Sequence, residues 1–349
     1  MKRTTGWVST AIVLAALAPL QSRAASAEVV DVPVTFHVLN TNTTVTKCQT
    51  DGKPYTIRGD LVAPASALSE TTHNAVALYI HGSGDGSTWH FTAVPGVDYI
   101  TQMAGMGHVS VFIHNLGYGT SDPADGSKIC FGSFADIAHQ VVQALRAGSY
   151  VAGGRTPITF ERVALAGHSA GGIAAELYSI SYHDIDALVI VGWADSAPTL
   201  TSLYGDVGRV GIECARGGES KQPGGPAGWA KVFTTREEWD ALFFNSDPTV
   251  EDAFIPRYED DPCGALNDLG QALAASVALS PMVDLPILLA YGDHDPFPPG
   301  AFEMQRARYV SSSDVSLAVL PATGHQIMLG RTAPAFRSVM SNWLSAHGF

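Results

Sequence analysis

The fold of this chain is indicated by one stretch, Arg162-Val163-Ala164-Leu165-Ala166-Gly167-His168-Ser169-Ala170-Gly171-Gly172. Its apolar first half runs into the pattern Gly-x-Ser-x-Gly, and a helix-compatible segment follows at once. This order predicts a buried strand, a sharp turn at Ser169 and a helix. Glycine is expected at positions 167 and 171 because neighbouring backbone would come too close there for a Cβ.

The predicted turn exposes the hydroxyl of Ser169 over the end of the sheet, which makes it a candidate nucleophile. The N–H of Ala170 and the positive end of the following helix point to the same place, where an oxyanion would be stabilised. The alternative is that the pentapeptide only links a strand to a helix, so the hypothesis needs supporting residues elsewhere in the chain.

Residues 1–27 have the order of a secretory signal peptide. Lys2 and Arg3 precede an apolar run over residues 11–20, and the small triplet Ala25-Ser26-Ala27 follows. We therefore expect the mature chain to be secreted, into either the extracellular space or the periplasm. The apolar run is too short to span a bilayer, and no later stretch reaches about 18 uninterrupted apolar residues, so no membrane span is expected.

The mature chain is predicted to be acidic. The full sequence has a net charge of -13, and cleavage after residue 27 would remove three basic residues and no acid. Such a chain repels phosphate backbones, so nucleic acid is not an expected partner. An acidic surface that recruits another protein is a further alternative, although the charge by itself mainly favours solubility.

Four cysteines, Cys48, Cys130, Cys214 and Cys263, lie in the mature part. An even number in an exported chain predicts two disulfides, for which three pairings exist. We expect Cys48 to pair with Cys130 and Cys214 with Cys263, because each pair falls within one structural unit; a Cys48–Cys214 bridge would instead join the two units. No metal is expected, because the zinc spacings Cys-x-x-Cys and His-Glu-x-x-His are absent.

Buried apolar runs alternate with helical patterns along most of the chain. The runs cover residues 75–80, 109–113, 187–191, 286–290 and 315–320, and a helical stripe with Ser133 as its N-cap covers residues 133–150. An antiparallel hairpin is predicted over residues 29–38 and 55–62. The pattern as a whole predicts an α/β fold with a mostly parallel, doubly wound sheet of about eight strands.

The alternation of strands and helices stops between residues 197 and 285. This segment holds a Gly- and Pro-rich loop and helical patterns over residues 235–244 and 266–279. We expect it to be a helical cap inserted over the functional edge of the sheet, because an excursion of this length is uncommon as a plain connection. The domain prediction is therefore a core of residues 28–196 and 286–349 with a cap of residues 197–285.

Two later strand ends carry groups that would complete the chemistry of Ser169. The strand over residues 285–291 ends in Gly292-Asp293-His294-Asp295, and the last strand ends in Thr323-Gly324-His325. We predict that His325 is the base that takes the serine proton and that Asp295 orients it. Asp293 is expected to cap its turn or to be solvated. Asp195, after the preceding strand, is the competing candidate for the acid.

With Ser169, Asp295 and His325 in this order, the chain resembles the α/β-hydrolase-fold serine hydrolases, as an esterase- or lipase-like member with a cap. The resemblance implies that the backbone N–H groups of Ser83, after His81-Gly82, and Ala170 form the oxyanion hole. One family pattern, Asp-x-x-Gly-x-Gly-x-Ser, is altered here: His114 stands at its first position and Leu116 where a basic residue is frequent. This departure concerns the subfamily and leaves the triad unaffected.

The resemblance implies hydrolysis of a carboxylic ester or lactone through an acyl-enzyme on Ser169, without a cofactor. The same triad would serve peptide release, acyl transfer or perhydrolysis, and a non-catalytic ligand-binding member of the fold is the other alternative. Medium-sized apolar substrates are expected. The candidates for substrate contact are His81, Trp229, Trp239, Phe243 and Phe244. For the aromatic residues the alternative is the cap's own core, and for His81, as for His114 and His168, it is packing or a bond to backbone.

Overall fold

The computed structural model describes residues 28–69, 72–84, 86–196 and 207–349. The predicted signal peptide, residues 1–27, and the start of the predicted cap, residues 197–206, lie outside these ranges. The strands are β1 Val29–Leu39, β2 Pro54–Pro64, β3 Thr72–Ile80, β4 Ser110–Ile113, β5 Val151–Ala152, β6 Thr159–His168, β7 Ala187–Val191, β8 Trp229–Ala230, β9 Asp261–Pro262, β10 Ile287–Gly292 and β11 Val315–Leu320. The helices are α1 Tyr99–Gly105, α2 Phe131–Ala147, α3 Ala170–Ser181, α5 Val207–Ala215, α6 Arg236–Asp240, α7 Pro248–Phe254, α8 Cys263–Leu279, α9 Ala301–Arg306 and α10 Ala333–Ala346.

Within the described residues, nine strands form one mixed sheet in the order β11-β10-β7-β6-β3-β4-β2-β1-β5. Neighbouring strands from β11 to β4 run parallel, and β2, β1 and β5 extend the sheet in antiparallel fashion. The predicted hairpin is β1 with β2, which pairs Val29 with Pro64 and Leu39 with Pro54. The mostly parallel α/β sheet is confirmed; the sequence pattern does not predict β5, which has two residues.

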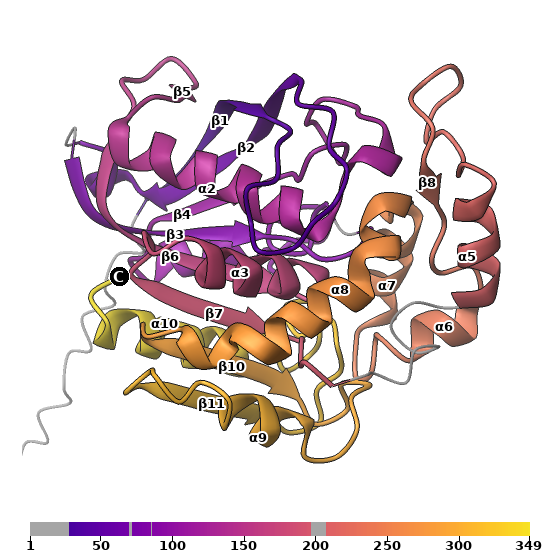
Figure 1. Ribbon diagram of the computed structural model, residues 1–349. Helices are drawn as coiled ribbons and strands as arrows, with labels where there is room; N and C mark the ends of the chain where they lie inside the picture. The colour runs from indigo at the N-terminus through magenta and orange to yellow at the C-terminus, as the bar shows by residue number, and fades with distance from the viewer. Residues whose placement is uncertain (1–27, 70–71, 85, 197–206) are drawn as a thin grey trace, which may run out of the picture.

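Helices cover both faces of this sheet. Adjacent residues in a buried strand point to opposite sides, so an unbroken apolar strand makes both faces apolar. In β3, Leu78 packs in a cluster with Val141 of α2 and Leu177 of α3. The next residue, Tyr79, belongs to a separate cluster on the other face, together with side chains of α1 and α10. Figure 1 shows α2, α3 and α8 in front of the strands. The two clusters make the sheet the rigid centre of the molecule.

Helix α2 begins earlier than its serine predicts. The prediction that Ser133 is the N-cap is wrong: Cys130 is the N-cap, and Ser133 is the third helical residue. The hydroxyl of Ser133 accepts the Cys130 N–H at 2.9 Å, and the Cys130 sulfur accepts the Ser133 N–H at 3.3 Å. Ser133 therefore caps the helix from inside its first turn, as the second member of a capping box.

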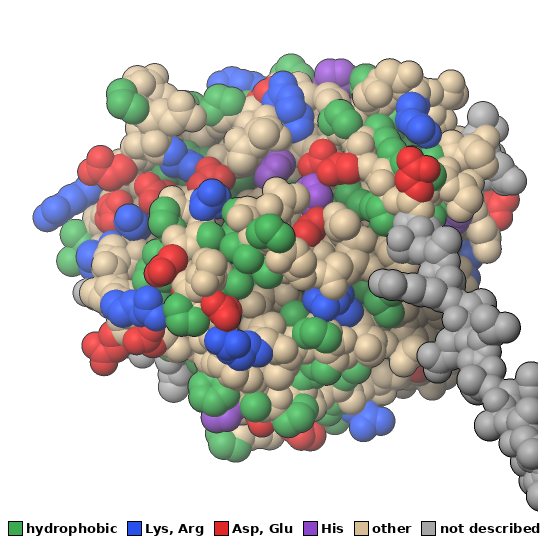
Figure 2. Space-filling model, turned by 180° about the vertical axis from the view of Figure 1, so that it is seen from behind, with side chains coloured by type: hydrophobic (Ala, Val, Ile, Leu, Met, Phe, Trp, Pro, Cys, Tyr) green, Lys and Arg blue, Asp and Glu red, His purple; other side chains and the backbone are tan. Residues whose placement is uncertain are grey.

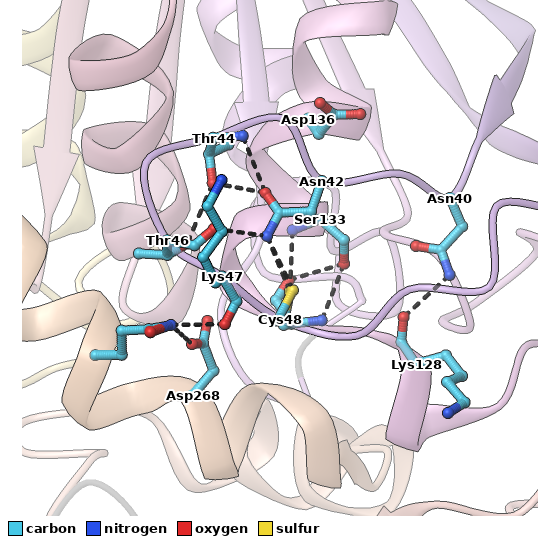
Figure 3. The surroundings of a disulfide bond; sticks show 12 residues. Asn40, Asn42, Thr44, Thr46, Lys47, Cys48, Lys128, Ser133, Asp136 and Asp268 are labelled. Atoms are coloured by element: carbon cyan, nitrogen blue, oxygen red, sulfur yellow. Dashed lines mark hydrogen bonds between the residues drawn. A yellow bond between two sulfur atoms is a disulfide. The ribbon is translucent and has the colours of Figure 1, made fainter.

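Two disulfides, Cys48–Cys130 and Cys214–Cys263, are present, and they are the two expected pairs. Around the first, Asn42 points at Cys48 (Figure 3), and its Nδ2 donates to the Cys48 sulfur at 3.0 Å and to the Thr46 carbonyl at 2.9 Å. This bridge fastens the loop between β1 and β2 to the start of α2. The second bridge joins α5 to the first residue of α8.

The carboxyl ends of the parallel strands lie at one edge of the sheet, where the loops after β3, β6, β10 and β11 meet. Residues 207–262, which we call the cap segment, contain α5, β8, α6, α7 and β9. Figure 1 shows them at the side toward which β7 and β10 point. Helix α8 then runs back along α2 and α3, so the last part of the predicted insertion packs against the core helices.

In the described part of the chain, no helix is both long and apolar enough to cross a bilayer. Acidic and basic side chains are interspersed over the face drawn in Figure 2. The net negative charge is therefore not gathered into a single acidic patch on that face.

Candidate active site

Ser169 lies where β6 ends and α3 begins, and its backbone has an uncommon conformation. Its φ is 53° and its ψ is -121°, a combination that a residue with a side chain adopts only when its surroundings enforce it. A Cβ at Gly167 would lie 2.1 Å from the carbonyl oxygen of Gly171, and a Cβ at Gly171 would lie 2.6 Å from that of His81. Close backbone contacts therefore require both glycines of the motif, and the turn directs the Ser169 hydroxyl away from the sheet.

The hydroxyl of Ser169 faces a buried histidine from the loop after β11. Ser169 Oγ lies 2.9 Å from His325 Nε2, and His325 Nδ1 lies 2.9 Å from Oδ1 of Asp295, in the loop after β10. The side chains of His325 and Asp295 are 3% and 1% exposed. A carboxylate at Nδ1 holds a proton on that nitrogen, which leaves Nε2 with a lone pair toward the serine. Three separate loops thus form one hydrogen-bonded chain.

Asp195, the competing candidate for the acid, lies in a different network. Its Oδ1 accepts from Ser276 Oγ at 2.9 Å and from Trp193 Nε1 at 3.3 Å. Its Oδ2 lies 3.3 Å from Nη1 of Arg308. Asp293 has the role expected of it, since its Oδ1 accepts the backbone N–H of Thr323 at 3.0 Å and so closes the turn before His325.

His168, inside the serine motif, supports the loop that carries His325. Its Nε2 donates to the carbonyl oxygen of His325 at 3.0 Å. Burial lowers the pKa of His168 well below its usual value, so the ring is neutral and carries a single N–H. This agrees with the alternative in which the histidine binds backbone. It also couples the turn at Ser169 to the position of the imidazole beside it.

His81 fixes the loop after β3 that holds the second candidate oxyanion donor. Burial lowers its pKa to about 3. In the neutral ring, Nδ1 donates to the Gly82 carbonyl at 2.8 Å and Nε2 accepts the Asn115 N–H at 3.0 Å. Ala170 is the first residue of α3, so its N–H belongs to the group that finds no partner within a helix. Ser83 and Ala170 line the same small space.

Two small spaces flank these candidate donors, and Gly82 and Ser83 line both of them. One space lies beside Ala170 and is lined mainly by apolar side chains, among them Phe131, Phe134 and Leu266. The other lies beside Ser169 and His325. The cap segment contributes Phe233, Leu242 and Tyr258 to the second space.

The cap aromatics that the sequence suggests as substrate contacts line neither of these two spaces. Trp239 and Phe243 pack within the cap, with ring centroids 5.0 Å from Phe233 and 5.4 Å from Phe254, respectively. These contacts agree with the alternative that both residues belong to the cap's own core. Phe244 is 40% exposed and stacks on His294 of the Asp295 loop at 3.6 Å.

Trp229 likewise lies away from Ser169. Its ring centroid is 5.4 Å from that of Tyr118, and Lys221 Nζ lies 4.2 Å above it. Of the five suggested contacts, His81 alone lines one of the two spaces. The cap side chains that line the space beside Ser169 are Phe233, Leu242 and Tyr258, which the sequence does not single out because the short cap elements have no long apolar period.

A sheet of parallel strands with a serine at a sharp strand-to-helix turn is the architecture of an α/β hydrolase. The model of the alpha/beta hydrolase family matches residues 77–336 of this chain, and the chain belongs to that family. It is therefore a hydrolase by family. Among curated proteins, no sequence matches this chain significantly.

Solved structures with the same fold include lipases and esterases. A soluble variant of the monoglyceride lipase of Saccharomyces cerevisiae, in complex with a substrate analog, has a TM-score of 0.63 at 17% identity, over 87% of this chain and 96% of that one. The monoacylglycerol lipase of Paleococcus ferrophilus has a TM-score of 0.58 at 15% identity, over 79% and 97%. A thermophilic esterase of Thermogutta terrifontis has a TM-score of 0.57 at 18% identity, over 90% and 99%. At these identities the likeness concerns the fold.

Proposed function

We propose that this hydrolase cleaves carboxylic esters or lactones through an acyl-enzyme on Ser169. The observation that carries the proposal is the hydrogen-bonded chain from Asp295 through His325 to the hydroxyl of Ser169, with 2.9 Å at both links. A serine hydroxyl is a weak nucleophile until a base removes its proton, and a neutral imidazole at this distance is such a base. The lipases and esterases among the structural neighbours agree with this class of reaction.

In the proposed acylation, Ser169 Oγ attacks the carbonyl carbon of the ester while its proton moves to His325 Nε2. Asp295 stabilises the imidazolium that forms and keeps its ring in place. The carbonyl oxygen becomes an oxyanion that accepts hydrogen bonds from the backbone N–H groups of Ala170 and Ser83. Collapse of this intermediate breaks the bond to the alcohol, which leaves with the proton from His325.

Deacylation repeats these steps with water in place of the serine. His325 takes a proton from water, the hydroxide attacks the acyl carbon, and collapse returns the proton to Ser169 Oγ. The products are a carboxylic acid and a free enzyme. Every proton in this cycle is carried by the residues named, so the chemistry requires no cofactor.

The two small spaces support a substrate of modest size with apolar groups on both sides of the carbonyl. The leaving alcohol must be near His325 Nε2, so it belongs to the space lined by Phe233, Leu242 and Tyr258. The acyl group then occupies the space beside Ala170, next to Phe131 and Phe134. Each space has a cavity volume of only about 10 Å³ in this structure, far below ordinary ligand pockets, which start at roughly 300 Å³. Short to medium acyl chains are therefore the proposed substrates.

We further propose that residues 197–285 act as a cap that selects the substrate and that the enzyme works after export. The cap side chains beside Ser169 support the first point. Two disulfides, which are typical of proteins from oxidising compartments, support the second. The charged, apolar and small-residue order of residues 1–27 agrees with export.

The test is a panel of p-nitrophenyl esters from acetate to dodecanoate, with a few lactones and an aminopeptidase substrate. We expect wild-type activity to be highest on short or medium acyl chains. Ser169→Ala should lower kcat by about 10³-fold or more, because the three residues act as a unit. Ser66→Ala, an exposed serine after β2 at the opposite edge of the sheet, is the matched control and should behave as wild type. Retained activity in Ser169→Ala, or cleavage of the aminopeptidase substrate alone, would contradict the proposal.

A further inference from the structure

The loop after β3, which carries Ser83, is held by a buried carboxylate of the cap segment. Asp261, at the start of β9, is 2% exposed. Its Oδ1 accepts the backbone N–H of Gly84 at 2.8 Å and the hydroxyl of Tyr118 at 2.7 Å. Its Oδ2 accepts the hydroxyl of Tyr258 at 3.2 Å. The cap therefore binds the residue that directly follows the candidate oxyanion donor.

Gly84 is also bound to the cap segment through its carbonyl oxygen. The N–H of Glu259 donates to the carbonyl oxygen of Gly84 at 2.8 Å. Gly84 has a φ of +54°, and a Cβ there would lie 2.1 Å from the ring of Tyr258. Both backbone polar groups of Gly84 and the space beside it are thus taken up by the cap segment.

Ser83 lies between two residues whose backbone groups are hydrogen-bonded to buried side chains. On one side, His81 bonds to the Gly82 carbonyl from within the core. On the other side, Asp261 bonds to the Gly84 N–H from the cap. Asp261 also lines the space shared by Ser83 and Ala170. A loop fixed at both ends keeps its N–H groups in one direction, which is what stabilisation of an oxyanion demands.

We propose that Asp261 is a positioning residue that holds the Ser83 N–H toward the developing oxyanion and so makes the oxyanion hole depend on the cap. The inference rests on the proposed function, because it assigns no chemistry of its own to Asp261. The carboxylate acts through Gly84 and does not need to touch the substrate.

The charge on Asp261 makes its hydrogen bond with the Gly84 N–H dependent on pH. Burial raises its pKa to about 6, against the hydrogen bonds from Tyr118, Gly84 and Tyr258 that favour the ionised form. Below about pH 6, one oxygen becomes a hydroxyl, and the neutral group accepts weaker hydrogen bonds than the carboxylate does. The titratable and charged groups around it are Tyr118 on the loop after β4, Tyr258, Glu259 and Asp260 on the cap, Lys221, and His81 and His114 of the core.

Among these groups, Lys221 is engaged elsewhere. Its Nζ lies 2.5 Å from Glu259 Oε2 and donates to the Gly117 carbonyl at 2.7 Å. Its charge therefore lowers the pKa of Asp261 less than the hydrogen bonds from Tyr118, Gly84 and Tyr258 do. His81 is neutral, so the carboxylate of Asp261 has no cation in direct contact among the described residues, and its titration remains governed by burial.

The experiment compares Asp261→Ala, Asp261→Asn and the matched controls Asp260→Ala and Asp260→Asn, all in the full-length protein. At pH 7.5, with a short p-nitrophenyl ester, Asp261→Ala should lower kcat by about 10- to 100-fold with KM within about threefold, because a displaced loop misplaces an oxyanion donor. Asp261→Asn keeps an acceptor for Gly84 and should restore kcat to within about fivefold of wild type. Both Asp260 variants should match wild type.

Two further readouts separate positioning from a loss of structure. Phenylboronic acid forms a tetrahedral adduct with an active serine, so its inhibition constant should rise in Asp261→Ala in step with the fall in kcat. From pH 7.5 to pH 5, wild-type kcat should fall more steeply than that of Asp261→Asn, which cannot titrate at this site. Should Asp261→Ala fail to fold, the comparison of pH profiles between wild type and Asp261→Asn decides the matter.

Equal kcat in the alanine variants of Asp261 and Asp260, or identical pH profiles for wild type and Asp261→Asn, would overturn this inference alone. A wild-type protein that hydrolyses no ester and binds no boronic acid would overturn the proposed function, and this inference with it.

Discussion

Two aspartates, Asp195 and Asp295, each follow a buried strand at the same edge of the sheet, and residue type alone does not separate them. Their surroundings do. Asp295 lies 2.9 Å from the Nδ1 of His325, whereas Asp195 is occupied by Ser276, Trp193 and Arg308. A carboxylate that orients a histidine has to reach it, so distance favours Asp295 for this role.

Asp295→Asn should lower kcat by up to about 10⁴-fold, because an amide at Nδ1 presents the wrong tautomer of His325 to the serine. Asp195→Asn keeps the shape of the side chain at a site away from the imidazole and should cost much less activity. The measurement is kcat for both variants on the best ester of the panel, with circular dichroism to show that each is folded. If Asp195→Asn loses more activity than Asp295→Asn, the acid is misassigned.

The site residues that the sequence predicts are those that sit at the ends of regular strands. Ser169, Asp295 and His325 each follow an apolar run, and their order along the chain is fixed by the fold. Asp261 has no such signal. It follows Glu259 and Asp260, and a run of acids is typical of a solvated surface, so its burial and its bond to Gly84 become visible only when the cap is folded against the core.

At the level of elements, a buried acid pair joins α3, the end of β7 and helix α8. Glu176 and Asp195 are 0% and 3% exposed, and they lie close enough for their charges to interact. Glu176 Oε1 also accepts from Tyr309 OH at 2.6 Å. Burial, and then the charge of Asp195, raises the pKa of Glu176 well above its usual value. Burial raises the pKa of Asp195 as well, and the charge of Arg308 opposes that rise, so we predict that Glu176 is the partner that holds a proton.

This pair makes the free energy of unfolding depend on pH. Glu176 binds its proton more tightly in the folded chain than in the unfolded chain, where the pKa is 4.5. Its contribution to stability is complete below that value and is lost as the pH rises toward the folded pKa. In Glu176→Gln the amide oxygen still accepts the hydrogen bond from Tyr309, and the side chain cannot titrate. The free energy of unfolding of wild type should therefore fall, relative to the variant, by up to about 1.4 kcal/mol per pH unit between pH 5 and pH 8.

Urea unfolding at four values of pH between 5 and 8 measures this difference. Glu237→Gln, which changes an exposed glutamate of α6, is the matched control and should follow wild type. A Glu176→Gln variant with the same pH dependence as wild type would show that Glu176 is ionised in the folded protein.

The elements themselves were predictable to different degrees. The core strands are long apolar runs between turn residues, and a pattern of that kind has few alternatives. The sequence does not determine the start of α2, because Ser133 can cap a helix either from outside or from within its first turn, and the sulfur of Cys130 takes the outer position. Strand β5 has two residues and depends on its pairing with β1, which a local pattern does not reveal.

At the level of the whole molecule, the cap segment contacts the loops of both halves of the site. Glu259 and Asp261 hold the loop of Ser83. On the other side, Leu242 accepts the Gln326 N–H at 3.1 Å, and Asn245 Nδ2 donates to the Ala322 carbonyl at 2.8 Å. The loop of His325 is therefore also fastened to the cap. The sequence predicts a cap here but not these contacts, because each joins residues about 80 to 180 positions apart through loops without a regular period.

The central claim is that Ser169 is the nucleophile and that His325 activates it. The most direct measurement is reaction of the intact protein with a fluorophosphonate, followed by mass spectrometry of its peptides. Wild type should gain one adduct, on the peptide that contains Ser169, and Ser169→Ala should gain none. In His325→Ala the rate of labelling should fall by at least about 10²-fold, the lower end of what a positioned base contributes. An adduct on any other residue, or labelling that persists in Ser169→Ala, would contradict the claim.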